Sequence, residues 1–257
     1  MSLGEPRRRR SRTAVSVTVL AVFAAASPWL TPSAAPPPGA DVAQGRAPSG
    51  SGRHQGPRPA IVLRAAWRAE SVDTAPAGVR YAPAVRAAVI HHTSTPNGYD
   101  CASVPSTLRG LYAGHAHGRH WDDIGYNFLV DACGTIYEGR AGGVDRAVVG
   151  AHTRGFNEGT VGIAAIGTFD GGETVPEPML AAIARLVAWK LDPLGPDPRG
   201  SVALVSTNDE ARYPKGAKAL LPVVGGHADG YPTRCPGAAL YARLPDIAAR
   251  AARIQHR

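Results

Sequence analysis

A Gly- and Pro-rich stretch near the end of the chain places an imidazole and a thiol eight residues apart. It runs from Gly226 to Gly237 and contains His227 and Cys235. Its Gly and Pro residues make it too irregular for a helix, so we expect a loop that folds back and brings the two side chains together. A histidine and a cysteine on one loop are typical zinc ligands.

A third ligand has to come from another part of the chain, and an apolar run that ends in two histidines is the best source. The segment Val89–Thr93 reads Val-Ile-His-His-Thr, which predicts a buried strand that holds its last side chains rigidly. Adjacent strand residues point to opposite faces, so only one of His91 and His92 can reach a given ion. Three protein ligands leave a fourth position open for water, the pattern of a catalytic zinc site.

A second group of histidines offers a competing metal site. His115, His117 and His120 lie close together in the chain, and imidazoles suit several transition metals. No cysteine or carboxylate joins them at a useful spacing. Solvated surface histidines are therefore the simpler explanation.

Composition limits the chain to one sizeable domain. Its 257 residues are 44% hydrophobic, enough for one globular domain of roughly 150–200 residues plus further segments. The net charge is +8, but residues 1–35 hold five arginines and one glutamate, which leaves +4 for the rest. This modest charge forms no Lys/Arg stripe, which argues against a nucleic-acid partner. It is compatible with an anionic polymer such as a bacterial cell wall.

The N-terminal part of the chain contains no predicted domain. A basic segment, Arg7–Arg12, precedes an apolar run, Thr13–Ala26, and small residues follow. This order is typical of a signal peptide, placed at residues 1–32, and predicts a secreted, extracellular or wall-associated protein. An uncleaved membrane anchor is the alternative. Residues 33–60 are rich in Pro, Gly and Ala and predict a disordered linker.

Three cysteines are an odd number for an exported protein, which predicts one bound or reactive thiol. Pairing Cys101 with Cys133 would leave Cys235 for metal. Two reduced thiols are the alternative, but an oxidising compartment favours the disulfide.

Predicted strands and helices alternate through the domain, which we place at residues 61–254. The predicted strands are 87–91, 161–167 and 221–224, together with a hairpin formed by 126–130 and 135–138. The predicted helices begin near 103, 177 and 238, and Pro245 either kinks the last one or opens another. Residues 192–220 predict a long loop. The alternation indicates an α/β fold with a single mixed central β-sheet and helices packed on its faces.

Five motifs, in this order, resemble the peptidoglycan recognition protein family, which includes the type 2 N-acetylmuramoyl-L-alanine amidases. They are Val89–Thr93, Trp121–Phe128, Ile136–Arg140, Gly150–His152 and Gly226–Gly237. The resemblance implies the amidase type 2 fold and a zinc-dependent hydrolase. Its substrate would be peptidoglycan, both glycan strand and stem peptide, cleaved at the amide bond between N-acetylmuramic acid and L-alanine.

The resemblance also implies the roles of individual residues. It gives His91, His227 and Cys235 as the zinc ligands. Tyr126 would orient the attacking water, and Thr233 would hydrogen-bond the reacting carbonyl oxygen. Each of these last two has a structural alternative, since Tyr126 could be a core tyrosine and Thr233 a turn residue.

His152 and Arg140 would contact the substrate, although His152 has a structural role as its alternative. The chain departs from the family at Ala228, where members often carry a larger basic or polar residue directly after the zinc histidine.

The alternative function is a non-catalytic, peptidoglycan-binding recognition protein. Such members typically lose the cysteine ligand, so the presence of Cys235 favours an enzyme.

Overall fold

The computed structural model describes residues 56–67, 78–191 and 194–257. The predicted signal peptide, and the predicted linker up to residue 55, lie outside the described residues. At the end of the predicted linker, Gly56 is buried and its N–H donates to the Ala188 carbonyl. Within the described ranges, no helix is long and apolar enough to cross a membrane.

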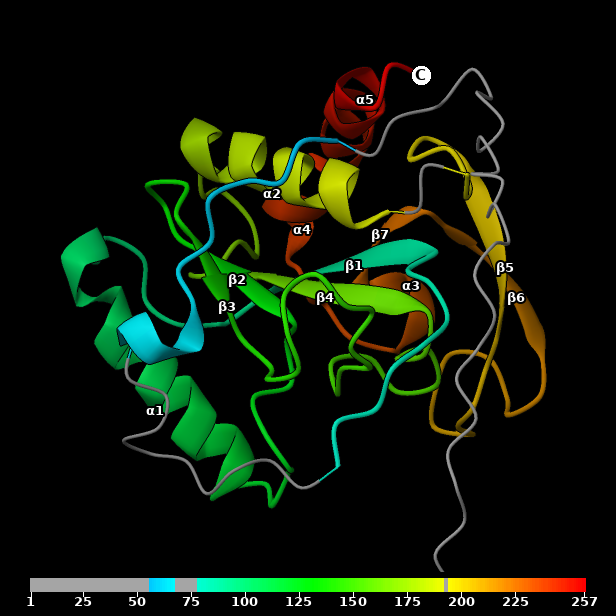
Figure 1. Ribbon diagram of the computed structural model, residues 1–257, viewed down its shortest axis with the longest axis horizontal. Coiled ribbons are helices and arrows are strands. Elements are labelled where there is room, and N and C mark those ends of the chain that lie inside the picture. Colours follow the sequence, from blue (N-terminus) through cyan, green and yellow to red (C-terminus); the bar gives the residue numbers. More distant parts are fainter. Residues whose placement is uncertain (1–55, 68–77, 192–193) are drawn as a thin grey trace, which may run out of the picture. The chain divides into compact units, whose positions relative to one another are not determined.

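A five-stranded mixed sheet lies at the centre of the fold (Figure 1). Its strands are β1 (Ala87–His92), β2 (Phe128–Val130), β3 (Ile136–Glu138), β4 (Thr160–Ala165) and β7 (Val224–Gly226), in the order β3-β2-β4-β1-β7. The three central strands, β2, β4 and β1, run parallel to one another, and β7 is parallel to β1. Only β3 is antiparallel to its neighbour in this sheet, β2. This confirms the predicted α/β class and the predicted hairpin.

Helices cover both faces of this sheet, with α1 (Val104–Ala116) on one side and α2 (Glu177–Lys190) and α5 (Leu244–Ile254) on the other (Figure 1). Side chains alternate between the two cores, so that Leu129 packs with Leu108 of α1. On the opposite face Ile163 packs in the cluster that holds Leu186 of α2. Because both faces are covered, the strands are continuous apolar runs in the sequence.

The prediction of a long loop at residues 192–220 is wrong in part. Two strands, β5 (Ser201–Val205) and β6 (Lys218–Pro222), form an antiparallel hairpin there. Their residues alternate between exposed and buried, with Val202 and Leu221 facing the core. The alternation is short and flanked by Pro, Gly and polar residues, which is why the sequence favoured a loop.

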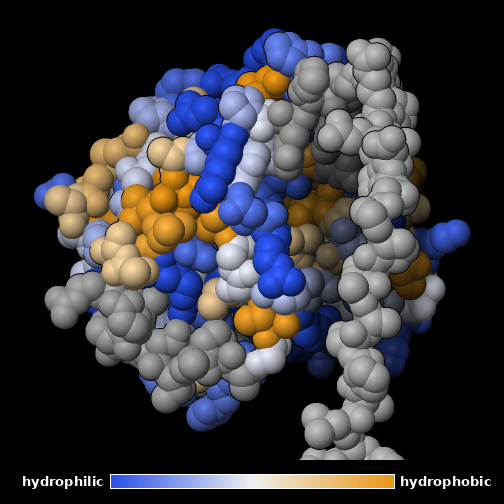
Figure 2. Space-filling model, viewed as in Figure 1, coloured by the Kyte–Doolittle hydropathy of each residue, from blue (hydrophilic) through white to orange (hydrophobic). Residues whose placement is uncertain are grey.

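The shorter elements connect this framework. Pro245 opens α5 within its first turn instead of kinking the preceding helix, which settles the alternative that the sequence left open. The short helices are η1 (Arg64–Trp67), η3 (Cys101–Ser103), α3 (His227–Gly230) and α4 (Ala238–Tyr241). Hydrophilic side chains divide the apolar surface into separate patches on the face shown in Figure 2.

Cys101 and Cys133 form the predicted disulfide, with their Cα atoms 6.4 Å apart. The bond ties η3, just before α1, to the turn between β2 and β3. Cys235 is a free cysteine.

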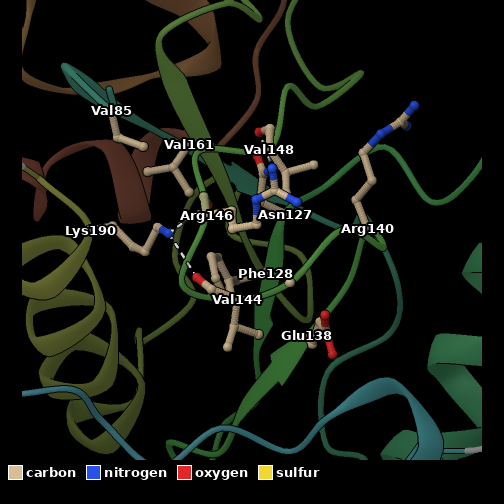
Figure 3. A pocket seen from close by; sticks show the side chains of 11 residues that line it. Val85, Asn127, Phe128, Glu138, Arg140, Val144, Arg146, Val148, Val161 and Lys190 are labelled. Carbon is tan, nitrogen blue, oxygen red and sulfur yellow. Dashed lines mark hydrogen bonds between the residues drawn. The ribbon is translucent and has the colours of Figure 1, made fainter. Parts of the chain in front are cut away.

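Lys190, the last residue of α2, anchors the segment that leads to Gly150–His152. Its buried ammonium group donates to the carbonyl oxygens of Val144 and Arg146. Figure 3 shows the amine directed toward Val144. The cavity lined by these residues has a volume of about 10 Å³, room for about one water molecule. Burial lowers the pKa of Lys190 to about 8.

Lys190 should therefore make stability depend on pH. The Lys190 amine binds its proton more weakly in the folded protein than in the unfolded chain. Below pH 8 the amine is charged in both states, and burying this charge lowers the free energy of unfolding. The destabilisation disappears as the pH rises from about 8 toward 10.5, because the amine then loses its proton in the folded protein. We expect the free energy of unfolding of the wild type, relative to Lys190→Met, to rise by about 3 kcal/mol across this window. Urea denaturation of both proteins at several pH values measures the difference. A pH-independent difference would contradict the buried cation.

Candidate metal centre

Two of the predicted ligands lie at the carboxyl ends of neighbouring parallel strands, β1 and β7. The register pairs Ile90 of β1 with Gly226 of β7, so the residues that follow them, His91 and His227, lie side by side. Their ring centroids are 4.5 Å apart. His92 points to the opposite face, as strand alternation predicts, where its ring contacts the Ser94 hydroxyl at 3.0 Å.

The third predicted ligand, Cys235, lies close to His91 and His227 because the chain reverses direction after His227. The helical turn α3 makes this reversal, where the sequence predicted only an irregular loop, and the Ala228 N–H donates to the Cys235 carbonyl. The Cys235 sulfur lies 3.7 Å from His91 Nδ1 and accepts a hydrogen bond from the His92 backbone N–H at 3.4 Å. One ligand atom from each of His91, His227 and Cys235 lies within 4.8 Å of the others.

The spacing of His91 and Cys235 fits a tetrahedral zinc ion. Zinc–nitrogen and zinc–sulfur bonds of ordinary length, meeting at a tetrahedral angle, hold the nitrogen and sulfur about 3.6 Å apart. The observed separation between His91 Nδ1 and Cys235 Sγ is 3.7 Å. Among the described residues one other group has suitable spacing, Cys101, Asp131 and Cys133, but its sulfurs are already joined in the disulfide.

The competing histidine cluster does not assemble in the described part of the chain, because His115, His117 and His120 form no such group of ligand atoms. His115 is buried instead, and its Nδ1 accepts a hydrogen bond from the Gly125 N–H at 3.1 Å. Its ring packs against that of Tyr126, with centroids 5.5 Å apart. His115 therefore supports the segment that carries Tyr126.

Burial keeps the three ligand side chains neutral when no metal is bound. Desolvation, followed by the charges of neighbouring histidines, lowers the pKa of His91 well below its ordinary value. Desolvation also lowers the pKa of His227 to about 4 and raises the pKa of Cys235 to about 12. The imidazoles thus offer lone pairs at neutral pH, whereas the thiol must release a proton to bind a cation.

Tyr126 lies beside the ligands, with its ring centroid 5.2 Å from that of His91. Desolvation is the main cause that raises the pKa of the phenol, and Cys235 would raise it further once its thiol is ionised. Tyr126 is therefore a neutral hydrogen-bond donor at physiological pH and a poor general base.

Thr233 and Arg140 each make a contact within the protein. The Thr233 hydroxyl oxygen accepts a hydrogen bond from the Cys235 N–H at 3.2 Å. The Arg140 guanidinium donates to the Ile124 carbonyl at 3.3 Å and lies 3.6 Å from the Asp122 carboxylate. These contacts fix where both residues lie, and their roles toward a substrate stay predictions.

His152 contacts His91 on the side of its ring away from Cys235. Its ring is buried, and its Nδ1 is 3.1 Å from His91 Nε2. Desolvation, followed by the charges of His227 and Arg140, lowers the pKa of His152 to about 3. The sequence motif drew attention to this histidine but gave no signal for its contact with the ligand.

A cavity of about 310 Å³ opens beside His227 and is also bordered by His152. Sequence reasoning missed the other side chains that shape it, because they come from three separate segments. They include Arg119, Trp121, Arg154 and Tyr231. The Arg119 guanidinium lies 5.2 Å from the Trp121 ring centroid, and the Tyr231 ring stacks on that of His227. The cavity therefore offers aromatic faces and positive charge next to the predicted metal ligands.

Comparison with known proteins gives one matching family, described as N-acetylmuramoyl-L-alanine amidase, over residues 81–238. Among curated relatives, the chain is 38% identical to peptidoglycan-recognition protein LE of Drosophila melanogaster over 110 residues, which are 43% of this chain and 30% of that protein. It is 35% identical to the N-acetylmuramoyl-L-alanine amidase of Mus musculus over 116 residues, 44% of this chain and 21% of that protein. The chain thus spans less than a third of the length of either relative.

Solved structures agree with these sequence matches. One is peptidoglycan recognition protein-LE in complex with tracheal cytotoxin, described as a monomeric diaminopimelic acid-type peptidoglycan. It aligns with a TM-score of 0.55 and 27% identity, covering 72% of this chain and 92% of that one. The likeness confirms the fold that the resemblance implied.

The raised pKa of Cys235 should be visible in its reactivity. With a pKa of about 12, the thiol of the metal-free folded protein is almost wholly protonated at neutral pH. We expect alkylation by iodoacetamide at least about 100-fold slower than in the unfolded chain with its disulfide intact, because the thiolate is the nucleophile. The rate should rise about tenfold per pH unit up to about pH 10. A plateau near the pKa of an ordinary cysteine would contradict the buried thiol.

Proposed function

The chain belongs to the N-acetylmuramoyl-L-alanine amidase family, and from this premise we propose that it is a secreted, zinc-dependent amidase of peptidoglycan. It would hydrolyse the amide bond between N-acetylmuramic acid and the L-alanine of the stem peptide. The observation that carries the proposal is the convergence of His91, His227 and Cys235 at a spacing that fits zinc.

The ligand set suits a catalytic role. When bound, zinc supplies Lewis acidity, which activates water and polarises a carbonyl oxygen. His91 and His227 would contribute neutral nitrogens and Cys235 a thiolate, so the ligands carry a single negative charge and the centre stays electrophilic. With three protein ligands, the remaining coordination position is available to water or substrate.

Tyr126 and Thr233 would handle the oxygen atoms of the reaction. The neutral Tyr126 phenol beside His91 can donate a hydrogen bond to the attacking water or to the oxygen that becomes negative. Thr233 accepts the Cys235 N–H, which leaves its own hydroxyl hydrogen for a substrate oxygen. Neither residue would act as a strong base.

The cavity beside His227 would hold the substrate. Aromatic rings such as Trp121 pack on the faces of sugars, and Arg119 can pair with carboxylates of a stem peptide. The related protein whose structure contains tracheal cytotoxin supports a peptidoglycan fragment as the ligand. Of the two predicted substrate contacts, His152 borders this cavity. Arg140 lines a different cavity, the one beside Lys190, and contacts Ile124 and Asp122, so its contact with substrate stays a prediction.

Export would follow the proposed domain plan, a signal peptide at residues 1–32, a linker at 33–60 and the amidase domain at 61–254. The disulfide between Cys101 and Cys133 supports an oxidising location.

The second candidate function is peptidoglycan recognition without catalysis, which the names of several relatives favour. The free Cys235 at the ligand cluster supports the enzyme instead.

Removing the sulfur ligand tests the enzyme against the recognition protein. We expect Cys235→Ser to stay folded and to bind soluble muropeptides, but to release no free stem peptide. Zinc binding should weaken by more than the roughly 10- to 100-fold that is lost when a supporting partner of a ligand is removed, because the thiolate ligand itself is gone. Digestion of defined muropeptides, followed by mass spectrometry of the products, measures the activity. Chelation should abolish the activity of the wild type, and added zinc should restore it. Wild-type activity in Cys235→Ser would rule out the proposed metal centre.

A second prediction separates Tyr126 from the ligands. We expect Tyr126→Phe to lower kcat by about 100-fold, because one hydrogen-bond donor to the reacting oxygens is lost. Zinc content and KM should change little. Tyr81→Phe is the matched control, since the Tyr81 hydroxyl bonds the Gly142 carbonyl at an exposed position. Equal kcat values for the two variants would remove Tyr126 from the reaction.

A further inference from the structure

A chain of hydrogen bonds runs from the ligand His91 into the protein core. His91 Nε2 lies 3.1 Å from His152 Nδ1. His152 Nε2 lies 3.4 Å from the Thr160 hydroxyl oxygen, which in turn lies 2.5 Å from the Phe156 carbonyl oxygen. All four residues are buried.

The last group in this chain sets the direction of all the bonds. A carbonyl oxygen can only accept, so the Thr160 hydroxyl donates its single hydrogen to the Phe156 carbonyl at 2.5 Å, with the Asn157 carbonyl farther away at 3.3 Å. The Thr160 oxygen must then accept from His152, which places the His152 hydrogen on Nε2. A neutral imidazole with hydrogen on Nε2 accepts at Nδ1. His91 therefore donates through its Nε2–H and keeps a bare lone pair on Nδ1, the atom 3.7 Å from the Cys235 sulfur.

The fold is shaped to hold the His152 ring in this position. A Cβ atom at Gly162 of β4 would lie 2.3 Å from His152 Cγ, and one at Gly150 would lie 2.6 Å from its Cδ2. Only residues without a side chain leave room for the ring at these two points. The Asn157 side chain also accepts the His152 backbone N–H at 2.9 Å, which fixes the turn. With both nitrogens engaged inside the protein, the ring offers the adjoining cavity only its carbon edge.

We propose that His152 is a positioning residue, which fixes the tautomer and orientation of His91 so that His91 Nδ1 faces the other two ligands. The proposal rests on the proposed zinc-binding function of these residues. It gives Thr160 a supporting role through the same chain of bonds. Partners of this kind, behind a metal ligand, orient the ligand and raise its basicity.

The hydrogen bond itself can be tested without metal. In metal-free protein labelled with ¹⁵N-histidine, we expect His91 to carry its hydrogen on Nε2 and to show a ¹⁵N–¹⁵N coupling across the bond to His152 Nδ1. The coupling should vanish in His152→Leu. A wild-type His91 protonated on Nδ1, or the absence of the coupling, would overturn the proposal.

Zinc affinity tests the consequence, through competition with a fluorescent chelator. We expect His152→Leu to weaken binding 10- to 100-fold. His152→Gln should recover part of the loss, because its amide can accept from His91 and donate to Thr160. Both variants have to show a folded far-ultraviolet spectrum and a cooperative unfolding transition.

A matched pair of threonine variants separates the hydrogen-bond chain from general packing. Thr160→Val removes the acceptor of His152 and should weaken zinc binding, by less than His152→Leu does. Thr153→Val changes a buried hydroxyl that has no hydrogen-bond partner among the described residues and should leave the affinity unchanged. Equal affinities for wild type, His152→Leu and Thr160→Val would overturn the proposal. A wild type that binds no zinc would instead overturn the proposed function, and the coupling experiment would still decide the role of His152.

Discussion

The parallel pairing of β1 with β7 is the constraint on which the candidate metal centre depends. It places Ile90 opposite Gly226, so that His91 and the residue after Gly226 reach the same edge of the sheet together. Gly226 also allows the returning chain to come close, since a Cβ there would lie 2.8 Å from Pro236 and from the Tyr241 ring. A shift of this register by one residue would turn His91 toward the helices of the other face. The cysteine on the returning loop would then have no nitrogen partner from β1.

Desolvation decides the charge state of this centre. The same burial lowers the pKa of the imidazoles and raises that of the thiol, so the metal-free cluster is neutral. A cation reverses the balance for Cys235 alone, because a thiolate beside a divalent ion is no longer an uncompensated buried charge. The imidazoles need no change of protonation. The surroundings therefore suit one cation with one anionic ligand, which agrees with the set of two histidines and one cysteine.

The sequence predicted those parts of the fold and site that depend on local pattern. Apolar runs identified β1 and β4 because both faces of the sheet are covered, and the order of the motifs pointed to His91, His227 and Cys235. The β5–β6 hairpin was missed because its alternation is short. The place of His152 was missed for a different reason, since the spacing of residues does not tell which side of a ligand a distant loop will reach. Only the packing of that turn over Gly162 places its ring behind His91.

Two buried histidines contact predicted site residues, or the segment that carries them, in the same physical way. His115 accepts the Gly125 N–H, next to Tyr126, and His152 accepts from His91 in the proposed bond direction. A protonated imidazole has no lone pair, so either support would fail if the ring carried a charge. Burial prevents this, because it lowers the pKa of His115 to about 4 and that of His152 to about 3. The core around the centre thus does more than exclude water. By keeping these rings neutral, it preserves the acceptor for the Gly125 N–H and the acceptor that the proposed bond to His91 needs.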